Sequence, residues 1–176
     1  MRAPRGMDVR PTSDRLRETL FNVLTAGRPN ALDDAVWIDA FAGSGAVGIE
    51  ALSRGAQTAY FIDSFRAATA AIRENLASLG IEEGFEIHER EAVTALRRLE
   101  SAAVTCDFCF LDPPYADNES YEQVLDLLAQ SQLLKPASIV IAEHDKRFDP
   151  GEKFGALVRY RRLDQGDTSL SFYRLG

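Results

Sequence analysis

The tetrapeptide Asp112-Pro113-Pro114-Tyr115 combines a carboxylate, a rigid turn and an aromatic ring, directly after the apolar run 108–111. Each proline ring fixes φ near about −65° and removes a backbone donor, so a central strand cannot continue past this point. The pattern predicts that Asp112 and nearby backbone carbonyls lie at the carboxyl edge of a sheet, with the Tyr115 ring beside them as a flat platform. Such a site suits a planar aromatic amine.

A glycine-rich segment lies upstream, with the spacing G-x-G-x-x-G at Gly43, Gly45 and Gly48, and Asp63 ends the next apolar run. These glycines let the backbone approach a ligand, and Asp63 can accept hydrogen bonds from two ribose hydroxyls. Taken alone, the pattern fits a nicotinamide dinucleotide as well as a methyl donor, since both contain an adenosine. Asp39 favours the methyl donor, because it would repel a pyrophosphate and attract the ammonium of a methionine group.

The elements that must position these residues alternate along the chain. Leu16, Leu20, Val23 and Leu24 recur at helical spacing and predict an amphipathic helix that ends near Gly27. The chain then alternates predicted strands at 36–41, 59–63, 85–88, 108–112 and 138–143 with predicted helices at 47–54, 66–79, 92–99 and 121–128. This order predicts a doubly wound α/β fold with a mostly parallel sheet and helices on both faces. Residues 157–163 and 169–175 predict a C-terminal antiparallel hairpin.

Composition limits the possible classes of protein. The 176 residues, 45% of them hydrophobic, suit a single domain over 1–176. The net charge of −7 argues against a general nucleic-acid coat protein, although residues 1–28 hold six arginines against three acids, and 1–10 form a short basic arm. No apolar run of about 18 residues and no signal sequence is found, so we expect a cytoplasmic protein, and a monomer.

Two possible metal-binding patterns are weak. Cys106 and Cys109 have the spacing C-x-x-C, but they fall in a predicted strand, where residues three apart point to opposite faces. We therefore expect them to be unpaired, buried small hydrophobic residues, and no second pair completes a zinc site. His88 and His144 are isolated and are expected to be structural, so the sequence predicts no metal.

Three segments of the sequence resemble the RsmD family of bacterial 16S ribosomal RNA guanine-N2 methyltransferases. They are RPTSDRLRETLFN at 10–22, DAFAGSG at 39–45 and DPPY at 112–115, and the resemblance continues through 48–56 and 166–170. The resemblance implies a Rossmann-like S-adenosylmethionine-dependent methyltransferase fold, S-adenosylmethionine as cofactor and 16S rRNA as substrate. Family members usually carry a basic hairpin before the first segment, whereas nine residues precede it here, and Phe65 stands where a further acidic residue is common.

The resemblance also implies the site residues. Asp112, Pro113 and Tyr115 would be catalytic. Thr12 and Arg15 would approach the methionine end of the donor, Asp63 would hold the ribose, and Glu91 and Ala92 would flank the adenine. The full implied cofactor set is Thr12, Arg15, Asp39, Phe41, Gly43, Ser44, Gly45, Asp63, Ser64, Glu91, Ala92 and Asp112.

A mechanism follows from the chemistry of the amine. The exocyclic nitrogen of guanine is a poor nucleophile, because its lone pair is delocalised into the ring. Asp112 and the carbonyl of Pro113 can accept its two hydrogens, which favours a pyramidal nitrogen and aims the lone pair at the methyl group. Tyr115 would stack on a base taken out of its helix. Since few phosphate contacts are available, we expect the substrate to be a 30S particle or an assembly intermediate.

Three alternatives remain open at this point. A DNA or RNA adenine-N6 or cytosine-N4 methyltransferase shares the tetrapeptide, but it would normally need a target-recognition segment, and no stretch is long enough. A nicotinamide-dependent oxidoreductase shares the glycine turn and leaves 112–115 unexplained. A non-catalytic RNA-binding module is disfavoured by the net charge of −7.

Overall fold

A computed structural model describes residues 14–114 and 117–176. In this part of the chain the helices are α1 (Asp14–Thr25), α2 (Ala46–Ser53), α3 (Arg66–Ser78), α4 (Ala92–Ser101) and α5 (Asn118–Gln130). The strands are β1 (Val36–Ala40), β2 (Thr58–Asp63), β3 (Phe85–Glu89), β4 (Cys106–Leu111), β5 (Leu134–Asp145), β6 (Lys153–Phe154), β7 (Leu157–Gln165) and β8 (Thr168–Leu175).

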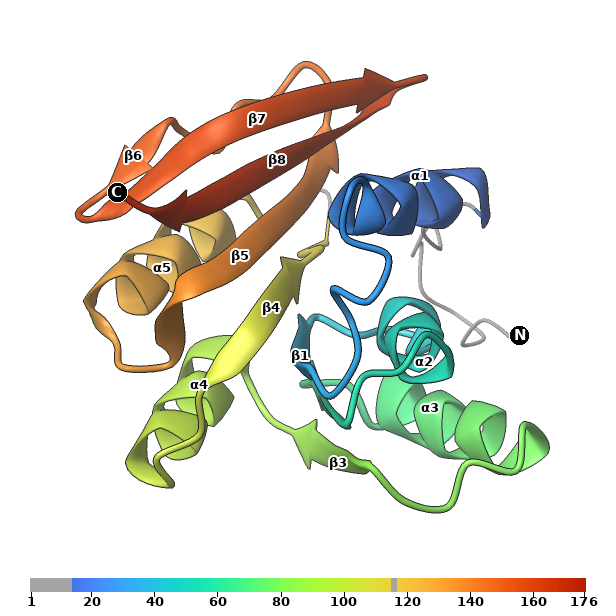
Figure 1. Cartoon of the computed structure of the whole chain (residues 1–176). Coiled ribbons are helices and arrows are strands. Elements are labelled where there is room, and N and C mark those ends of the chain that lie inside the picture. Colours follow the sequence, from blue (N-terminus) through green and yellow to red (C-terminus); the bar gives the residue numbers. More distant parts are fainter. Residues whose placement is uncertain (1–13, 115–116) are drawn as a thin grey trace.

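All the described strands belong to one sheet with the order β3-β2-β1-β4-β5-β8-β7-β6 (Figure 1). Strands β1 to β5 pair in parallel, and β8, β7 and β6 are added antiparallel to β5 and to one another. The predicted doubly wound α/β fold with a C-terminal hairpin is therefore confirmed. The short strand β6 was not predicted, because two residues carry no periodic signal.

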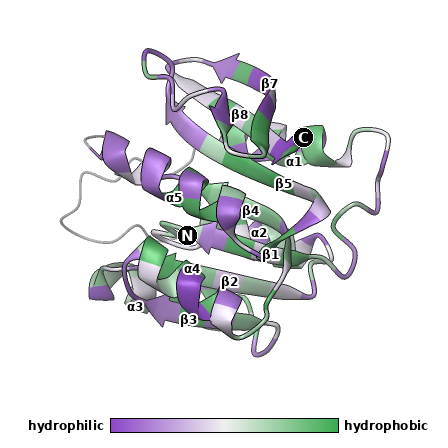
Figure 2. Ribbon diagram, turned by 90° about the vertical axis from the view of Figure 1, so that its left-hand side faces the viewer, coloured by the Kyte–Doolittle hydropathy of each residue, from purple (hydrophilic) through white to green (hydrophobic). Residues whose placement is uncertain are grey.

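Helices cover both faces of the sheet and divide the core into two clusters. Helices α1, α2 and α3 bury Leu20, Val47 and Ile72 on one face, and α4 and α5 bury Leu96 and Leu125 on the other. Figure 2 shows hydrophobic residues concentrated on the central strands and hydrophilic ones along β7. No described helix is long and apolar enough to cross a membrane.

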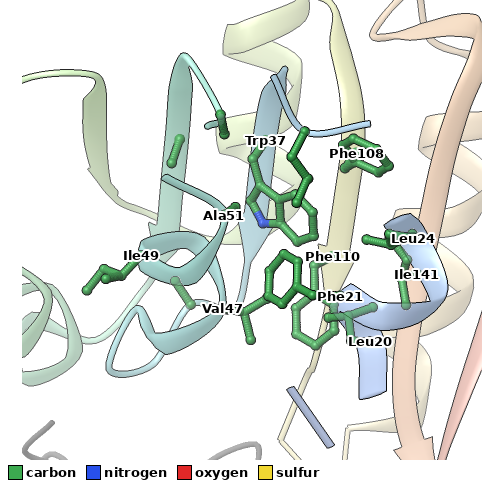
Figure 3. Packing of buried hydrophobic residues seen from close by; sticks show 14 of the residues in the cluster. Leu20, Phe21, Leu24, Trp37, Val47, Ile49, Ala51, Phe108, Phe110 and Ile141 are labelled. Atoms are coloured by element: carbon green, nitrogen blue, oxygen red, sulfur yellow. The ribbon is translucent and has the colours of Figure 1, made fainter. Parts of the chain in front are cut away.

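Helix α1 packs where its apolar spacing predicted. Figure 3 shows Trp37 of β1 in the first cluster, next to Phe21 of α1 and to Phe108 of β4. The ring centroids of Trp37 lie 5.5 Å from Phe21 and 5.4 Å from Phe108. Three fully or nearly buried rings in contact anchor α1 to the middle of the sheet.

One prediction about β4 is wrong. Cys106 and Cys109 are free and buried as predicted, but both lie in the same core cluster and not on opposite faces. The pairing with β5 shifts between Cys106, opposite Leu134, and Phe108, opposite Ile139, and at this point Asp107 accepts hydrogen bonds from Val36 N (2.9 Å) and Lys135 Nζ (2.8 Å). This irregularity breaks the two-residue alternation on which the prediction depended.

The same irregularity explains why β5 begins at Leu134, four residues before its predicted start. Between the two regular stretches of pairing, Ser138 Oγ donates to the carbonyl of Cys106 (2.5 Å) and accepts from the N–H of Lys135 (2.8 Å). The buried Ser138 side chain thus forms hydrogen bonds with a backbone N–H and a backbone carbonyl that the shifted strand pairing leaves unpaired. The strand can then accommodate Pro136, which donates no hydrogen bond.

Candidate active site

Four acidic side chains lie at the carboxyl edge of neighbouring parallel strands. Asp39 is near the end of β1, Asp63 ends β2, Asp112 follows β4, and Glu143 lies near the end of β5. The register places Ala142 of β5 beside Leu111, so Glu143 comes level with Asp112. Parallel strands bring their ends together, which is why four acids far apart in the sequence form one group.

Two of these acids hold the glycine turn in place. The Gly48 N–H donates to Asp39 Oδ2 and the Gly43 N–H donates to Asp63 Oδ2, both at 2.9 Å. Asp63 Oδ1 also accepts from Phe65 N at 2.9 Å. Both carboxylates are therefore oriented before any ligand binds, and each oxygen keeps a further lone pair for one.

Backbone conformation requires glycine at one position of the turn, and close packing requires it at one position of the helix that follows. Gly45 has φ of 78°, and a Cβ on Gly48 would overlap the ring of Phe61. Helix α2 can therefore press against β2 only without a side chain at Gly48. Phe41, a predicted cofactor residue between Asp39 and the glycines, is held at φ of 69°, a conformation rare for a bulky residue and typical of functional turns.

Asn75 supports the glycine turn from a distant helix, and sequence reasoning missed it. It lies on the buried side of α3, and its Nδ2 donates to the carbonyl of Ser44 at 2.9 Å. The amide thereby ties the predicted cofactor residue Ser44 to a helix that begins 22 residues later. The available signal was a polar residue between the apolar positions Ile72 and Leu76 of a helix.

The acids raise one another's affinity for protons. Burial raises the pKa of Asp39 from the ordinary 3.8 to about 7; the Gly48 N–H opposes this shift, and Asp63 and Glu143 add to it. Burial, then Glu143 and Asp39, raise the pKa of Asp112 well above its usual range. Burial also raises the pKa of Asp63, against the two N–H groups that it accepts. Such a group lowers its energy by binding a cation.

The segment after β4 leaves the sheet as predicted. Asp112 is half-buried, Pro113 is buried and Pro114 is exposed. The Asp117 N–H then donates to the carbonyl of Pro114 at 2.8 Å, and Asp117 caps α5 by accepting from Ser120 N. The segment therefore begins at the end of a sheet strand, and the capped helix α5 follows it. Tyr115 lies outside the described residues.

The remaining predicted cofactor residues that the structure describes are mostly exposed. Glu91 is exposed at the N-terminus of α4, close enough to raise the pKa of Asp63, and Ala92 behind it is buried. Ser64 is exposed next to Asp63. Arg15 is exposed in the first turn of α1, where its side chain forms no ion pair with a described residue. Thr12 lies outside the described residues.

The acidic side chains and the glycine turn fit a ligand that carries a positive charge and an adenosine. An anionic group such as a pyrophosphate would face Asp39, Asp112 and Glu143, which disfavours a nicotinamide dinucleotide. Between residues 14 and 114 and between 117 and 176, no group of three or more His, Cys, Asp or Glu side chains could hold a metal ion. His144 is buried, and its Nε2 lies 2.9 Å from Ser171 Oγ, while burial lowers its pKa.

Comparisons with known proteins agree with the fold. The family model described as Conserved hypothetical protein 95 matches residues 1–174. The Bacillus subtilis protein YlbH, provisionally named an rRNA methyltransferase, is 32% identical over 174 residues, covering 99% of this chain and 92% of its own length. Ribosomal RNA small subunit methyltransferase D of Haemophilus influenzae is 34% identical over 139 residues, covering 78% and 69%.

A solved structure also matches closely. The Escherichia coli protein yhhF, provisionally named a methyltransferase, superposes with a TM-score of 0.81 at 28% identity, covering 99% of this chain and 90% of its own. The similarity therefore extends over the sheet, the helices and the C-terminal hairpin.

Proposed function

The chain belongs to the RsmD family of rRNA methyltransferases, and on that premise we propose that it methylates the exocyclic N2 of a guanine in 16S rRNA. S-adenosylmethionine is the cofactor. The observation that supports transfer to an exocyclic amine is the arrangement at the end of β4, where the half-buried Asp112 is followed by the rigid Pro113 and is level with Glu143. A carboxylate and a carbonyl at adjacent positions match the two hydrogens of an amine.

Asp39 and Asp63 bind opposite ends of the cofactor in this proposal. Bound S-adenosylmethionine supplies a methyl group activated by its positively charged sulfur. Asp39, buried and oriented by Gly48, attracts the ammonium of the methionine moiety. Asp63, oriented by Gly43 and Phe65, accepts the ribose hydroxyls. The cation restores the ionised form of the acids, because it favours the charge that burial disfavours.

Asp112 both positions the amine and receives its proton. Its carboxylate accepts one hydrogen of N2 while the Pro113 carbonyl accepts the other, which directs the lone pair at the methyl group. As the new N–C bond forms and the S–C bond breaks, positive charge moves from sulfur to nitrogen, so the nitrogen proton becomes acidic. Burial and Glu143 raise the pKa of Asp112, which makes it a better acceptor for that proton than an exposed aspartate.

The remaining parts of the proposal concern the substrate. Tyr115 stacks on the target base, which has left its helix to reach the sheet edge. The substrate is a 30S particle or an assembly intermediate in the cytoplasm, and the enzyme acts as a monomer. A folded particle presents the base in a fixed place, which offsets the small number of phosphate contacts that a chain with a net charge of −7 can form.

Nucleoside analysis tests the reaction. We would incubate the enzyme with S-adenosylmethionine and 30S particles that lack the modification, digest the rRNA and identify the product by mass spectrometry. N2-methylguanosine is expected with the wild type and with Tyr115→Phe, which retains the ring, but not with Tyr115→Ala. N6-methyladenosine or N4-methylcytosine would instead support the alternative amine and refute the guanine assignment.

The choice of substrate is tested separately. Methyl transfer to protein-free 16S rRNA and to 30S particles should be compared across a salt series. We expect the particle to react faster at every salt concentration. Faster methylation of the free RNA would contradict the particle as substrate without affecting the reaction itself.

A further inference from the structure

Three arginines bring positive charge near one exposed tyrosine on the outer part of the sheet. Tyr160 of β7 is 40% exposed, and its ring packs against Phe172 of β8 with centroids 6.3 Å apart. The guanidinium carbon of Arg174 lies 5.1 Å from the centre of the same ring. Arg161 follows Tyr160 in the chain, and the charge of Arg28, in the segment after α1, is near enough to lower the pKa of Tyr160. We call Arg28, Tyr160, Arg161 and Arg174 the hairpin patch.

All three arginines act on the tyrosine hydroxyl from different elements. Burial raises the pKa of Tyr160, and Arg161, Arg174 and Arg28 each lower it; no acidic group contributes. The arginines are exposed, and none forms an ion pair with any residue in 14–114 or 117–176. The hairpin patch therefore concentrates three uncompensated positive charges on a chain whose net charge is −7.

The neighbouring arginines of β7 are different. Arg159 binds Asp149 at 2.6 Å and Glu152 at 3.4 Å, and Arg162 binds Asp149 at 3.4 Å and Asp164 at 3.1 Å. Their charges are neutralised within the protein. Positive charge on this strand is thus paired with acids at some positions and left free at others.

A strand irregularity and a ring orient the free charges. The pairing of β7 with β8 shifts between Arg159 and Arg161, and such a bulge redirects the side chains of the extra residue and its neighbour. Phe172 belongs to the core cluster that α1 covers, so Tyr160 above it lies on the α1 side of the sheet. The tyrosine ring then holds the Arg174 guanidinium through a cation–π contact.

The patch lies within reach of a substrate bound at Asp112. Phe172 pairs with Ile141, which pairs with Phe110, two residues before Asp112. With strands about 4.8 Å apart and residues about 3.3 Å apart along a strand, the patch is on the order of 15–20 Å from the reacting edge. An RNA helix places many phosphates within that distance.

We propose that the hairpin patch binds the phosphate backbone of the rRNA substrate, at a distance from the base that enters the active site. This inference rests on the proposed rRNA substrate. Guanidinium groups suit phosphate oxygens, because their N–H donors match them in pairs. Free positive charge favours RNA over an acidic protein surface here, since Tyr160 is the only exposed large hydrophobic residue of β7 and β8 on which a protein segment could pack.

The test replaces the three arginines together by alanine. The matched control replaces Arg73, Arg97 and Arg98, which are exposed on α3 and α4, form no ion pair in the described part of the chain, and remove the same charge. Methyl transfer to 30S particles is measured against particle and salt concentration. We expect the patch variant to raise KM about tenfold or more with kcat unchanged, and to reduce the slope of log affinity against log salt by about 2–3. The control should stay within about twofold of the wild type for both quantities.

Binding without turnover separates this inference from the proposed function. Fluorescence anisotropy with a labelled fragment of 16S rRNA requires no methylation, so it tests the patch even if the wild type modifies no rRNA and the proposed function fails. Equal affinity of the patch and control variants for the RNA would overturn the inference. A raised KM for particles with an unchanged salt slope would also overturn it, because the contact would then be with a ribosomal protein.

The tyrosine provides an independent check. Tyr160→Phe keeps the ring beneath Arg174 and should bind RNA like the wild type. Tyr160→Ala frees the guanidinium and should resemble Arg174→Ala. If Tyr160→Ala bound RNA normally while its circular dichroism matched the wild type, the tyrosine would not position Arg174.

Discussion

Replacing Asp39 by asparagine should make the ligand-free protein more stable at high pH. The asparagine side chain would remain able to accept from the Gly48 N–H, which donates to Asp39 Oδ2 at 2.9 Å, but it carries no charge to bury. The pKa of Asp39 rises on folding from 3.8 to about 7. The folded state therefore binds this proton more tightly than the unfolded state, and the free energy of unfolding falls as pH rises from 3.8 to about 7 and is constant above.

The size of the effect follows from the shift. Each pKa unit corresponds to about 1.4 kcal/mol, so the difference between 3.8 and about 7 amounts to about 4 kcal/mol when Asp39 is fully ionised. Part of this cost is already present at pH 5. Between pH 5 and pH 8 the wild type should lose about 2–3 kcal/mol relative to Asp39→Asn.

Urea unfolding of the two proteins without cofactor, at pH values from 5 to 8, measures this difference. Asp167→Asn, an exposed change in the turn between β7 and β8, is the control and should run parallel to the wild type. If the wild type and Asp39→Asn also ran parallel, within about 0.5 kcal/mol, Asp39 would not be a buried acid with a raised pKa and the reasoning would be refuted.

The affinity for the cofactor should rise with pH, whereas the stability of the ligand-free protein falls. Because a bound cation requires ionised Asp39, the affinity of the wild type for S-adenosylmethionine should fall about tenfold per pH unit below the pKa of about 7. Asp39→Asn should bind weakly and with little dependence on pH between 5.5 and 7. Calorimetry measures both, and a wild-type affinity independent of pH would contradict the role of Asp39 toward the ammonium.

Three further predictions concern the same edge of the sheet. Asp63→Ala should weaken S-adenosylmethionine by about 1.5–3 kcal/mol in calorimetry, because charge-assisted hydrogen bonds to the ribose are lost; unchanged affinity would exclude that contact. Asp112→Ala should lower the methylation rate by two or more orders of magnitude while donor affinity changes far less, and normal turnover would show that Asp112 is not catalytic. Gly48→Ala should destabilise the protein by about 1–3 kcal/mol in urea, because the new Cβ overlaps the Phe61 ring. Phe61→Leu in the same chain should recover part of that loss, and no recovery would place the strain elsewhere.

Much of the architecture was determined by local sequence signals. The helical spacing of Leu16, Leu20 and Leu24 predicted α1, and the alternation of apolar runs with glycine-ended helices predicted the parallel sheet. Because parallel strands end at one edge, the positions of Asp39, Asp63 and Asp112 after or near strand ends were enough to predict that they meet there. These features depend on residues close in the chain and on a general rule of topology.

Tertiary structure decided what depends on residues far apart in the chain. The Cys106–Cys109 prediction failed because the pairing of β4 with β5 is irregular next to Asp107, which accepts hydrogen bonds from Val36 and Lys135, and the alternation of β4 alone does not reveal this. Likewise, no local pattern connects Asn75 with the carbonyl of Ser44.

The electrostatics of the molecule were decided in the same way. The pKa of Asp39 depends on its burial, and then on Asp63 and Glu143, which belong to other strands. The hairpin patch includes Arg28 because the fold brings the charge of this residue, which follows α1, near enough to lower the pKa of Tyr160, more than a hundred residues later in the chain. Local propensity determined which elements form and where their polar ends lie, whereas burial and charge at each site depend on which other elements the fold brings beside them.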